Sequence, residues 1–368
     1  MAKTSRIAVL GGGNSALTMA ADLALAGAAV SLFEFEEYAA RLGPIRETRK
    51  IEKYGSLGAS GATGKAELTL VSTVMERAIA GADLIIVAVP AYAHMRFFEE
   101  LARCVSPGQT ILIAPGNWGA LRLYNLLRDK KVGAGVKIAE TDVCTHICRA
   151  GESFLGPDKV RVILERARLR LSAIPSVDTE SVIAMLQPFY PQIVRGENVI
   201  ETSLRNDNIV THGPLMLMNA GWLEHTAGNF MIYRDGLTPS VARAIDGVRK
   251  EREGVIGALN LPRVALPAPD ETFKRYASAQ WVHDPCEIGP PDLGHRYLSE
   301  DVPYGLVPLR EIGRTLGIAM PVIDAVIALS CIANDEDYSS AGLSLDDLGL
   351  AGLSPSDMLA YATSGERR

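Results

Sequence analysis

Apolar strands and amphipathic helices alternate through the first half of the chain. Apolar runs without alternation at 7–10, 84–89 and 110–114, the last of which begins with Thr110, are typical of strands that are covered on both faces of a parallel sheet. Apolar residues at helical spacing follow at 91–105 and 118–130. This alternation predicts an α/β fold built on a doubly wound parallel sheet.

The hydrophobic pattern changes near residue 193. Before that point, the Arg- and Glu-rich segment 36–54 is expected to be a helix or a loop. Beyond it, strand signals become rare and long helical patterns dominate, at 203–230, 238–260, 268–280, 306–316 and 320–333. We therefore expect an α/β domain at 1–192 and a second, mostly α-helical domain at 193–368.

The first predicted strand runs into a glycine-rich turn, Gly11-Gly12-Gly13, at the start of a helix. Gly11 permits the tight turn, Gly13 lets a pyrophosphate approach the backbone, and the small Ala16 lets the helix pack closely on the strand. The free N–H groups at the start of a helix favour negative charge. The motif therefore predicts a Rossmann domain that binds a nicotinamide or flavin dinucleotide.

The choice of dinucleotide depends on Glu34, which closes the second strand. A carboxylate at this point accepts hydrogen bonds from the ribose hydroxyls of NAD and repels the extra phosphate of NADP. Arg41, Arg46 and Arg49 follow closely and would hold that phosphate if their loop folds back. The sequence therefore favours NAD(H) and leaves NADP(H) open. We assign the cofactor contacts to Gly11, Gly13, Asn14, Ser15, Ala16, Glu34 and Pro90.

Composition and charge exclude several classes of protein. A chain of 368 residues is long enough for two domains, and 48% hydrophobic with 22% charged residues is typical of a globular protein. The net charge of −6 gives no basic surface for nucleic acid and no polybasic membrane anchor. Five cysteines are too sparse for a disulfide framework, and no apolar stretch approaches the ~18–20 residues of a membrane span. We expect a cytoplasmic protein.

The second domain carries the catalytic candidates. Asn208 and His212 are one helical turn apart, so they share a helix face. Pro214 has no N–H group, which predicts a kink that frees the His212 side chain. Asp301 is either a helix cap or the partner that fixes the His212 tautomer and raises its pKa. We predict His212 as a general acid, with a purely structural helical histidine as the alternative.

These and other motifs resemble the opine dehydrogenase family, of the octopine/nopaline type. The matching segments are GGGNSA at 11–16, AET…CR at 139–149, NDNIVTHGP at 206–214, GLTPSV at 236–241, EDVPYGLVP at 300–308, IDAVIALS at 323–330 and LGLAGLS at 348–354. The resemblance implies that NADH or NADPH reduces the imine formed between an α-keto acid and the amine of an amino acid. It also implies His212 as the acid/base and Asp301 as its partner, with Asn208 and Glu140 in the substrate site.

Other charged residues extend the expected substrate site. Glu140, just past a strand end, would orient the cationic amine. Arg149 and Arg205 are candidate clamps for substrate carboxylates, or else surface ion pairs. Asp142 and His146 lie in a segment that is more apolar in the family, so the keto acid or amine is expected to differ from the usual one.

A metal site is a weaker interpretation of the same segment. Cys144, His146 and Cys148 would lie on one face of a strand, but a fourth ligand is lacking. We therefore predict no metal.

Two other functions compete with the opine dehydrogenase prediction. A relative of ketopantoate reductase or 3-hydroxyacid dehydrogenase would share the domain order, but such enzymes use a helical lysine as the acid. The helical pattern at 203–230 contains no lysine, and Lys274 is the only lysine after Lys250. In a non-catalytic NAD-sensing binder, the group formed by His212, Asn208 and Asp301 would have no function.

The expected partners are small molecules, an α-keto acid and an amino acid or amine, whose identities and product stereochemistry the sequence leaves open. We expect no nucleic acid and no membrane as partners. The Met- and Trp-bearing segment 215–222 fits a homodimer interface as well as it fits a core.

Overall fold

The computed structural model describes residues 5–55, 58, 61–151 and 156–367, and these residues form two compact units. Unit 1 runs to Thr202 and includes Tyr361–Arg367, whereas unit 2 comprises Ser203–Ala360. The sequence placed this division at 192/193. The structure differs because the residues after 192 form strand β12 (Ile193–Arg195), which pairs in parallel with β11 (Leu169–Ile174) of unit 1.

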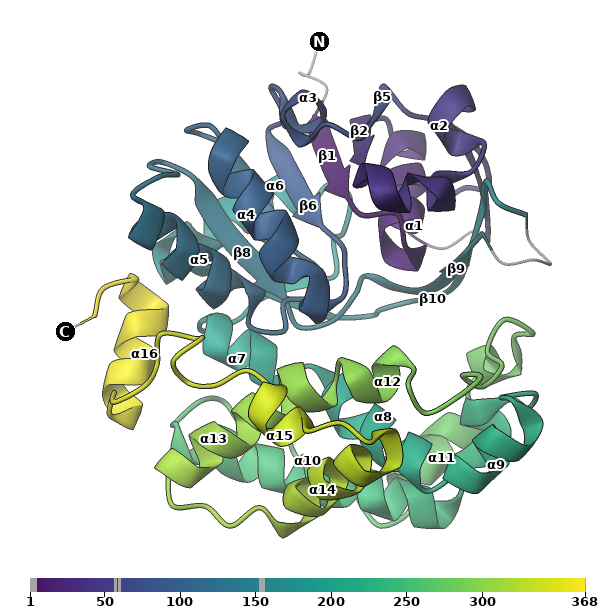
Figure 1. Ribbon diagram of the computed structural model, residues 1–368, viewed down its shortest axis with the longest axis vertical. Coiled ribbons are helices and arrows are strands. Elements are labelled where there is room, and N and C mark those ends of the chain that lie inside the picture. Colours follow the sequence, from purple (N-terminus) through teal and green to yellow (C-terminus); the bar gives the residue numbers. More distant parts are fainter. Residues whose placement is uncertain (1–4, 56–57, 59–60, 152–155, 368) are drawn as a thin grey trace. The chain divides into compact units, whose positions relative to one another are not determined.

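Unit 1 is built on a mostly parallel sheet (Figure 1). Its central strands β6 and β7 are buried along their whole length, as expected for strands covered on both faces. Strand β11 runs antiparallel to β8, whereas the other pairings of this sheet are parallel in the described residues. The order across the sheet is β12 (Ile193–Arg195), β11 (Leu169–Ile174), β8 (Lys137–Thr141), β7 (Thr110–Ile113), β6 (Leu84–Val87), β1 (Arg6–Leu10), β2 (Ala29–Phe33) and β5 (Leu70–Ser72).

Helices cover both faces of this sheet, with α4 and α5 on one face and α6 on the other (Figure 1). Alanines at the buried positions of α1 let it pack closely on the sheet, and Ala16, Ala20 and Ala21 are fully buried. The helices are α1 (Asn14–Leu25), η1 (Glu36–Leu42), α2 (Ile45–Thr48), α3 (Met75–Ile79), η2 (Ala91–Ala93), α4 (His94–Cys104), α5 (Gly119–Lys130), η3 (Ser176–Asp178), α6 (Thr179–Leu186) and α7 (Val199–Leu204).

A smaller sheet packs against α1 and was not expected from the sequence. Its strand order is β4 (Gly64–Glu67), β3 (Lys50–Tyr54), β10 (Lys159–Glu165) and β9 (His146–Ala150). The prediction of a helix or loop over 36–54 is wrong for β3. Lys53 is fully buried there, with its Nζ 3.1 Å from Oδ1 of Asp22 in α1, so a charged residue occupies a core position of the strand.

Unit 2 is mostly helical, as predicted. Its elements are α8 (Asp207–Leu217), α9 (Ala220–Thr226), η4 (Ile232–Gly236), α10 (Pro239–Ala258), α11 (Glu271–Ala277), η5 (Gln280–His283), α12 (Arg296–Ser299), η6 (Val302–Leu306), α13 (Val307–Thr315), α14 (Pro321–Asn334), α15 (Tyr338–Ala341) and α16 (Pro355–Ser364), whose last turn belongs to unit 1. Helix α8 packs against α10, α12, α14 and η6. Within the described ranges, no helix has the length and apolar character needed to cross a membrane.

Candidate active site

His212 and Asp301 form a buried pair within unit 2. Nδ1 of His212 lies 2.6 Å from Oδ2 of Asp301, and the two residues are only 4% and 2% exposed. A carboxylate at this distance holds Nδ1 as the protonated nitrogen, which fixes the tautomer and the ring orientation. The structure therefore brings together the two residues that the sequence singled out for catalysis, although they are 89 positions apart.

Local sequence explains how α8 presents His212. The side chain of Asn206 caps α8 by accepting a hydrogen bond from the backbone N–H of Asn208, at 2.9 Å. The helix continues through Pro214 to Leu217. The expected release of the His212 side chain by Pro214 is not observed, because aromatic side chains enclose the imidazole.

A glycine sets the approach of Asp301 to α8. Asp301 directly precedes η6, and Gly305 within η6 faces Ile209 of α8. A Cβ atom at Gly305 would lie 2.2 Å from Cγ2 of Ile209, which is far inside contact distance. Only glycine allows η6 and α8 to pack this closely, and this packing brings the carboxyl of Asp301 to His212.

Burial also tunes the acidity of Asp301. Loss of water around the carboxyl raises the pKa of Asp301 to about 7, and the nearby Arg296 opposes this rise. The carboxyl thus titrates near neutral pH, close to the ordinary range of a histidine.

Two tyrosines complete this group, and the sequence analysis missed both. Nε2 of His212 lies 2.9 Å from the hydroxyl of Tyr233, which lies 3.2 Å from the hydroxyl of Tyr297. The ring of Tyr297 stacks on the imidazole at a centroid distance of 3.6 Å and an angle of 13°. The available signal was that both tyrosines lie close to segments already singled out: Tyr233 lies three residues before GLTPSV, and Tyr297 lies four residues before Asp301.

The glycine-rich turn of unit 1 has the geometry of a dinucleotide loop. Gly11 has φ of +119°, and a Cβ there would lie 2.7 Å from Cγ1 of Val89. Gly13, the residue that precedes α1, has open space where a Cβ would be, and no side chain caps the helix. Backbone and open space at this helix start fit the pyrophosphate of a dinucleotide.

Other predicted cofactor contacts surround this turn. The hydroxyl of Ser15 lies 3.3 Å from Sγ of Cys144, and Oδ1 of Asn14 accepts a hydrogen bond from the backbone of Ala150 at 3.0 Å. Ala16 is fully buried, and Pro90 follows the central strand β6 at the carboxyl edge of the sheet. The side chain of Asn14 thus ties the start of α1 to β9.

Glu34 is more constrained than the sequence suggested. Its Oε2 accepts a hydrogen bond from the N–H of Gly12 and its Oε1 accepts one from the N–H of Phe35, both at 2.8 Å. Burial raises the pKa of this carboxyl, while the two backbone hydrogen bonds lower it. The carboxylate therefore lies directly beside the glycine-rich turn, at the end of β2.

The nearby arginines have partners of their own. Arg46 makes a bidentate ion pair with Glu36, with both N–O distances at 2.9 Å. Arg49 donates to the carbonyl of Thr69 at 3.2 Å, and Arg41 lies over the ring of Tyr38.

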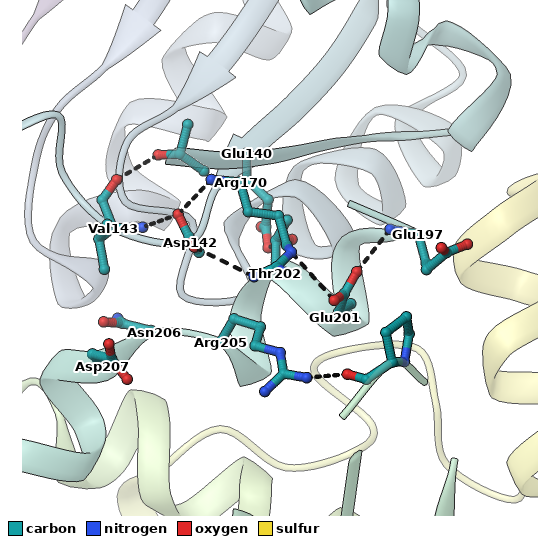
Figure 2. Close-up of polar contacts among 12 residues, drawn as sticks. Glu140, Asp142, Val143, Arg170, Glu197, Glu201, Thr202, Arg205, Asn206 and Asp207 are labelled. Carbon is teal, nitrogen blue, oxygen red and sulfur yellow. Dashed lines mark hydrogen bonds and ion pairs between the residues drawn. The ribbon is translucent and has the colours of Figure 1, made fainter. Parts of the chain in front are cut away.

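The structure places the predicted substrate residue Glu140 inside β8, so its expected position past the strand end is wrong (Figure 2). Glu140 is fully buried; its Oε2 accepts from the N–H of Ala120 at 3.0 Å and its Oε1 from the hydroxyl of Thr202 at 2.8 Å. These bonds tie β8 to the start of α5 and to α7.

The two candidate arginine clamps occupy different surroundings. Arg149 is half-buried in β9 and donates to the carbonyl of Cys148 at 3.0 Å. Arg205 is not at the surface: it is buried in unit 2, with Nη1 2.5 Å from Oε1 of Glu253, and it also donates to the carbonyl of Pro262 (Figure 2).

Asp142 and His146, which set this chain apart from the family pattern, are buried in unit 1. Asp142 accepts hydrogen bonds from the backbone of Val143 and Arg170, both at 3.0 Å (Figure 2). Nδ1 of His146 lies 2.8 Å from the hydroxyl of Thr145, and burial lowers the pKa of this imidazole. Across the residues that the structure describes, no group of three or more His, Cys, Asp or Glu side chains is arranged to hold a metal ion.

A dinucleotide-binding loop in unit 1 and a buried His–Asp pair in unit 2 are features expected of an NAD(P)-dependent oxidoreductase. Family models support both parts separately. Residues 6–116 match the N-terminus of NAD-dependent glycerol-3-phosphate dehydrogenase, and residues 195–334 match the α-helical domain of NAD/NADP octopine/nopaline dehydrogenase.

Individual relatives identify the family. The opine dehydrogenase of Arthrobacter sp. (strain 1C) is 32% identical over 96% of this chain and 97% of its own length. Octopine dehydrogenase of Pecten maximus is 24% identical, with coverage of 88% and 89%. A solved structure of octopine dehydrogenase with NADH and L-arginine has a TM-score of 0.72 at 20% identity and 99% coverage of both chains. The chain belongs to the opine dehydrogenase family.

Family membership confirms the resemblance seen in the sequence and the fold class predicted from it. It also confirms the predicted function, the NAD(P)H-dependent reductive condensation of an α-keto acid with an amino acid, and the nicotinamide dinucleotide cofactor. The ketopantoate reductase alternative is not favoured.

Proposed function

We propose that this chain forms and oxidises CH–NH bonds, with His212 as general acid/base and Asp301 as the residue that orients it. The observation that carries the proposal is the buried 2.6 Å contact between Nδ1 of His212 and Oδ2 of Asp301. Nε2, the other ring nitrogen, lies 2.9 Å from the Tyr233 hydroxyl and is the proposed site of proton exchange. Imine chemistry requires such a group, because a carbinolamine loses its hydroxyl only when the oxygen is protonated.

The proton balance follows from this geometry. The imidazolium of His212 is the source of the proton that the departing hydroxyl oxygen takes up as its C–O bond breaks. Water leaves, the substrate becomes an iminium ion, and His212 becomes a neutral imidazole. Asp301 accepts the hydrogen bond from Nδ1–H before and after this step, so the ring keeps its orientation.

The cofactor, when bound, supplies hydride to the iminium carbon. The chain's own residues that would hold it are the predicted set Gly11, Gly13, Asn14, Ser15, Ala16, Glu34 and Pro90. Gly11 and Gly13 would contact the pyrophosphate through backbone, because neither has a side chain and the space beside Gly13 is open. Ser15 would add a hydroxyl at the same helix start.

NADH is the proposed form of the cofactor. Glu34 stands beside Gly12, where a carboxylate accepts the ribose hydroxyls and repels a 2′-phosphate. Arg46 pairs with Glu36 through two hydrogen bonds, so a 2′-phosphate would have to compete with Glu36 for this guanidinium. The surroundings of Glu34 therefore support NADH over NADPH.

The substrate contacts stay predictions. Asn208, half-buried one turn before His212, is the proposed hydrogen-bonding partner of the substrate. Arg149 is the proposed carboxylate clamp. Glu140 keeps its predicted place near the amine, although both of its oxygens already accept hydrogen bonds from the chain. The cytoplasmic location and the homodimer expected from the sequence also stay predictions.

A substrate matrix tests the reaction class. We expect purified protein to consume NADH only when an α-keto acid and an amino acid are both present, with NADPH at least ~10-fold less efficient in kcat/KM. His212→Ala should lower kcat by ~10²-fold or more, because a general acid contributes that much, while the Kd of NADH changes less than ~2-fold.

The matched control is His225→Ala, an exposed histidine of α9 that should leave kcat unchanged. Reduction of a keto acid without any amine would contradict the reaction class. Equal activity of His212→Ala and wild type would remove His212 from the mechanism.

A further inference from the structure

Nε2 of His212 is directed at a hydroxyl group of the chain itself. The distance from Nε2 to the Tyr233 hydroxyl is 2.9 Å, well within hydrogen-bond range. Nδ1 is occupied by Asp301 at 2.6 Å, so the imidazole is held at both nitrogens. A proton that leaves His212 through Nε2 therefore meets the oxygen of Tyr233.

The Tyr233 hydroxyl is suited to receive and pass on a proton. A tyrosine hydroxyl donates one hydrogen bond and accepts others at the same time. The hydroxyl of Tyr297 lies 3.2 Å away, so the proton of Tyr233 has a second partner whenever Nε2 is itself a donor. Burial raises the pKa of Tyr233 well above its ordinary value, so this group stays a neutral hydroxyl.

Aromatic packing fixes the orientation of this hydroxyl. Trp281 packs edge-on against the ring of Tyr233 at 5.0 Å, and Tyr276 stacks on it at 6.0 Å. Asn219 holds the backbone of η4, which carries Tyr233, by donating to the carbonyl of Gly236 at 3.0 Å. The tyrosine is thus held in place from several sides, with its hydroxyl at Nε2.

We propose that Tyr233 is a further catalytic residue, which relays the proton between Nε2 of His212 and the hydroxyl oxygen of the carbinolamine. This inference rests on the proposed role of His212. In the relay, the O–H bond of Tyr233 breaks as its proton goes to the departing hydroxyl, and a new O–H bond forms with the proton from Nε2. Tyr233 ends as it began, the substrate loses water, and His212 ends neutral.

The variant Tyr233→Phe tests the relay, because it keeps the ring and removes only the hydroxyl. We expect kcat to fall at least ~30-fold while the KM for NADH stays within ~2-fold. Proton transfer should then limit turnover, so the primary isotope effect from NADH deuterated at the transferred position falls towards 1. A general loss of structure would change kcat and the KM for NADH together. The matched control is Tyr338→Phe, which removes a buried tyrosine hydroxyl that bonds Asn334 of α14 and no residue of the His212 group, and whose kcat should stay within ~2-fold.

Two outcomes are distinguishable in the same experiment. If Tyr233→Phe turns over like wild type while His212→Ala is inactive, the relay is wrong and the role of His212 stands. If His212→Ala is also active, the proposed function fails with it. Should Tyr233→Phe not fold, carbinolamine dehydration by the wild type, followed in a single turnover in mixtures of H2O and D2O, decides. Two protons in flight give a curved dependence of this rate on the D2O fraction, and a straight line overturns the relay.

Discussion

Asp301 links the proposed chemistry to stability at the scale of a single residue. Burial raises its carboxyl pKa from 3.8 to about 7, so the folded state keeps a proton that the unfolded chain loses. The stabilisation is complete below about pH 4 and is lost as pH rises to about 7. We predict that Asp301→Asn, which cannot ionise, removes this part of the pH dependence of Tm. Thermal melting at pH 4–8 measures it, and parallel Tm profiles for variant and wild type would contradict the raised pKa.

Single residues also show what the sequence could predict about the site. His212 and Asp301 are predictable from the helix face that His212 shares with Asn208 and from the family motifs that contain both residues, and the fold brings them within 2.6 Å. Tyr233 and Tyr297 were not found, because their contribution is a contact between side chains from η4 and α12. Nothing in the local sequence records that η4 and α12 bring these two hydroxyls together at His212.

At the scale of elements, the close packing of η6 on α8 positions Asp301 beside His212. We predict that Gly305→Ala is destabilising by at least about 1–3 kcal/mol, because the added methyl overlaps Ile209. The displaced η6 should also carry Asp301 away from His212 and lower kcat. Urea unfolding and steady-state kinetics measure the two effects.

Gly254→Ala is the control for Gly305→Ala. A Cβ at Gly254 in α10 meets no atom within 4 Å, so this variant should keep or slightly raise stability. If Gly305→Ala behaves like Gly254→Ala, the close approach of η6 to α8 is not required for the site.

Elements with a clear hydrophobic period were the predictable part of the fold. The buried strands β6 and β7 and the long helix α10 lie within the predicted segments. Strand β3 could not be predicted, because Lys53 occupies a fully buried position and its charge is offset by Asp22 of α1. A lysine in the sequence ordinarily indicates a solvent-exposed position. Here the ion pair with Asp22 lets Lys53 occupy a buried position instead.

At the scale of the whole molecule, the boundary between the two units does not coincide with the point where the hydrophobic pattern of the sequence changes. Strand β12 and the first turn of α7 belong to unit 1, although they follow the last long α/β pattern. Tyr361–Arg367 return to unit 1 after the whole of unit 2. The hydrophobic pattern reports local structure, whereas the assignment of these segments to unit 1 depends on contacts between segments far apart in the chain.

The returning C-terminal segment should therefore stabilise unit 1. Tyr361 is fully buried there, and its hydroxyl accepts a hydrogen bond from Arg128 of α5 at 2.8 Å and donates one to Asn125. We predict that Tyr361→Ala costs about 3–5 kcal/mol, as for other buried aromatic residues, and speeds amide exchange in α5. Hydrogen–deuterium exchange read by peptide measures this locally.

The same substitution in unit 2 provides the comparison. Tyr338 of α15 is 8% exposed, and its hydroxyl accepts a hydrogen bond from Asn334 of α14 at 3.0 Å. Tyr338→Ala should therefore speed exchange in α14 and leave α5 protected, the reverse of Tyr361→Ala. Because each tyrosine contacts helices of one unit, the two exchange patterns report which unit each segment stabilises. Unchanged exchange in α5 after Tyr361→Ala would place the C-terminal segment outside the cooperative structure of unit 1.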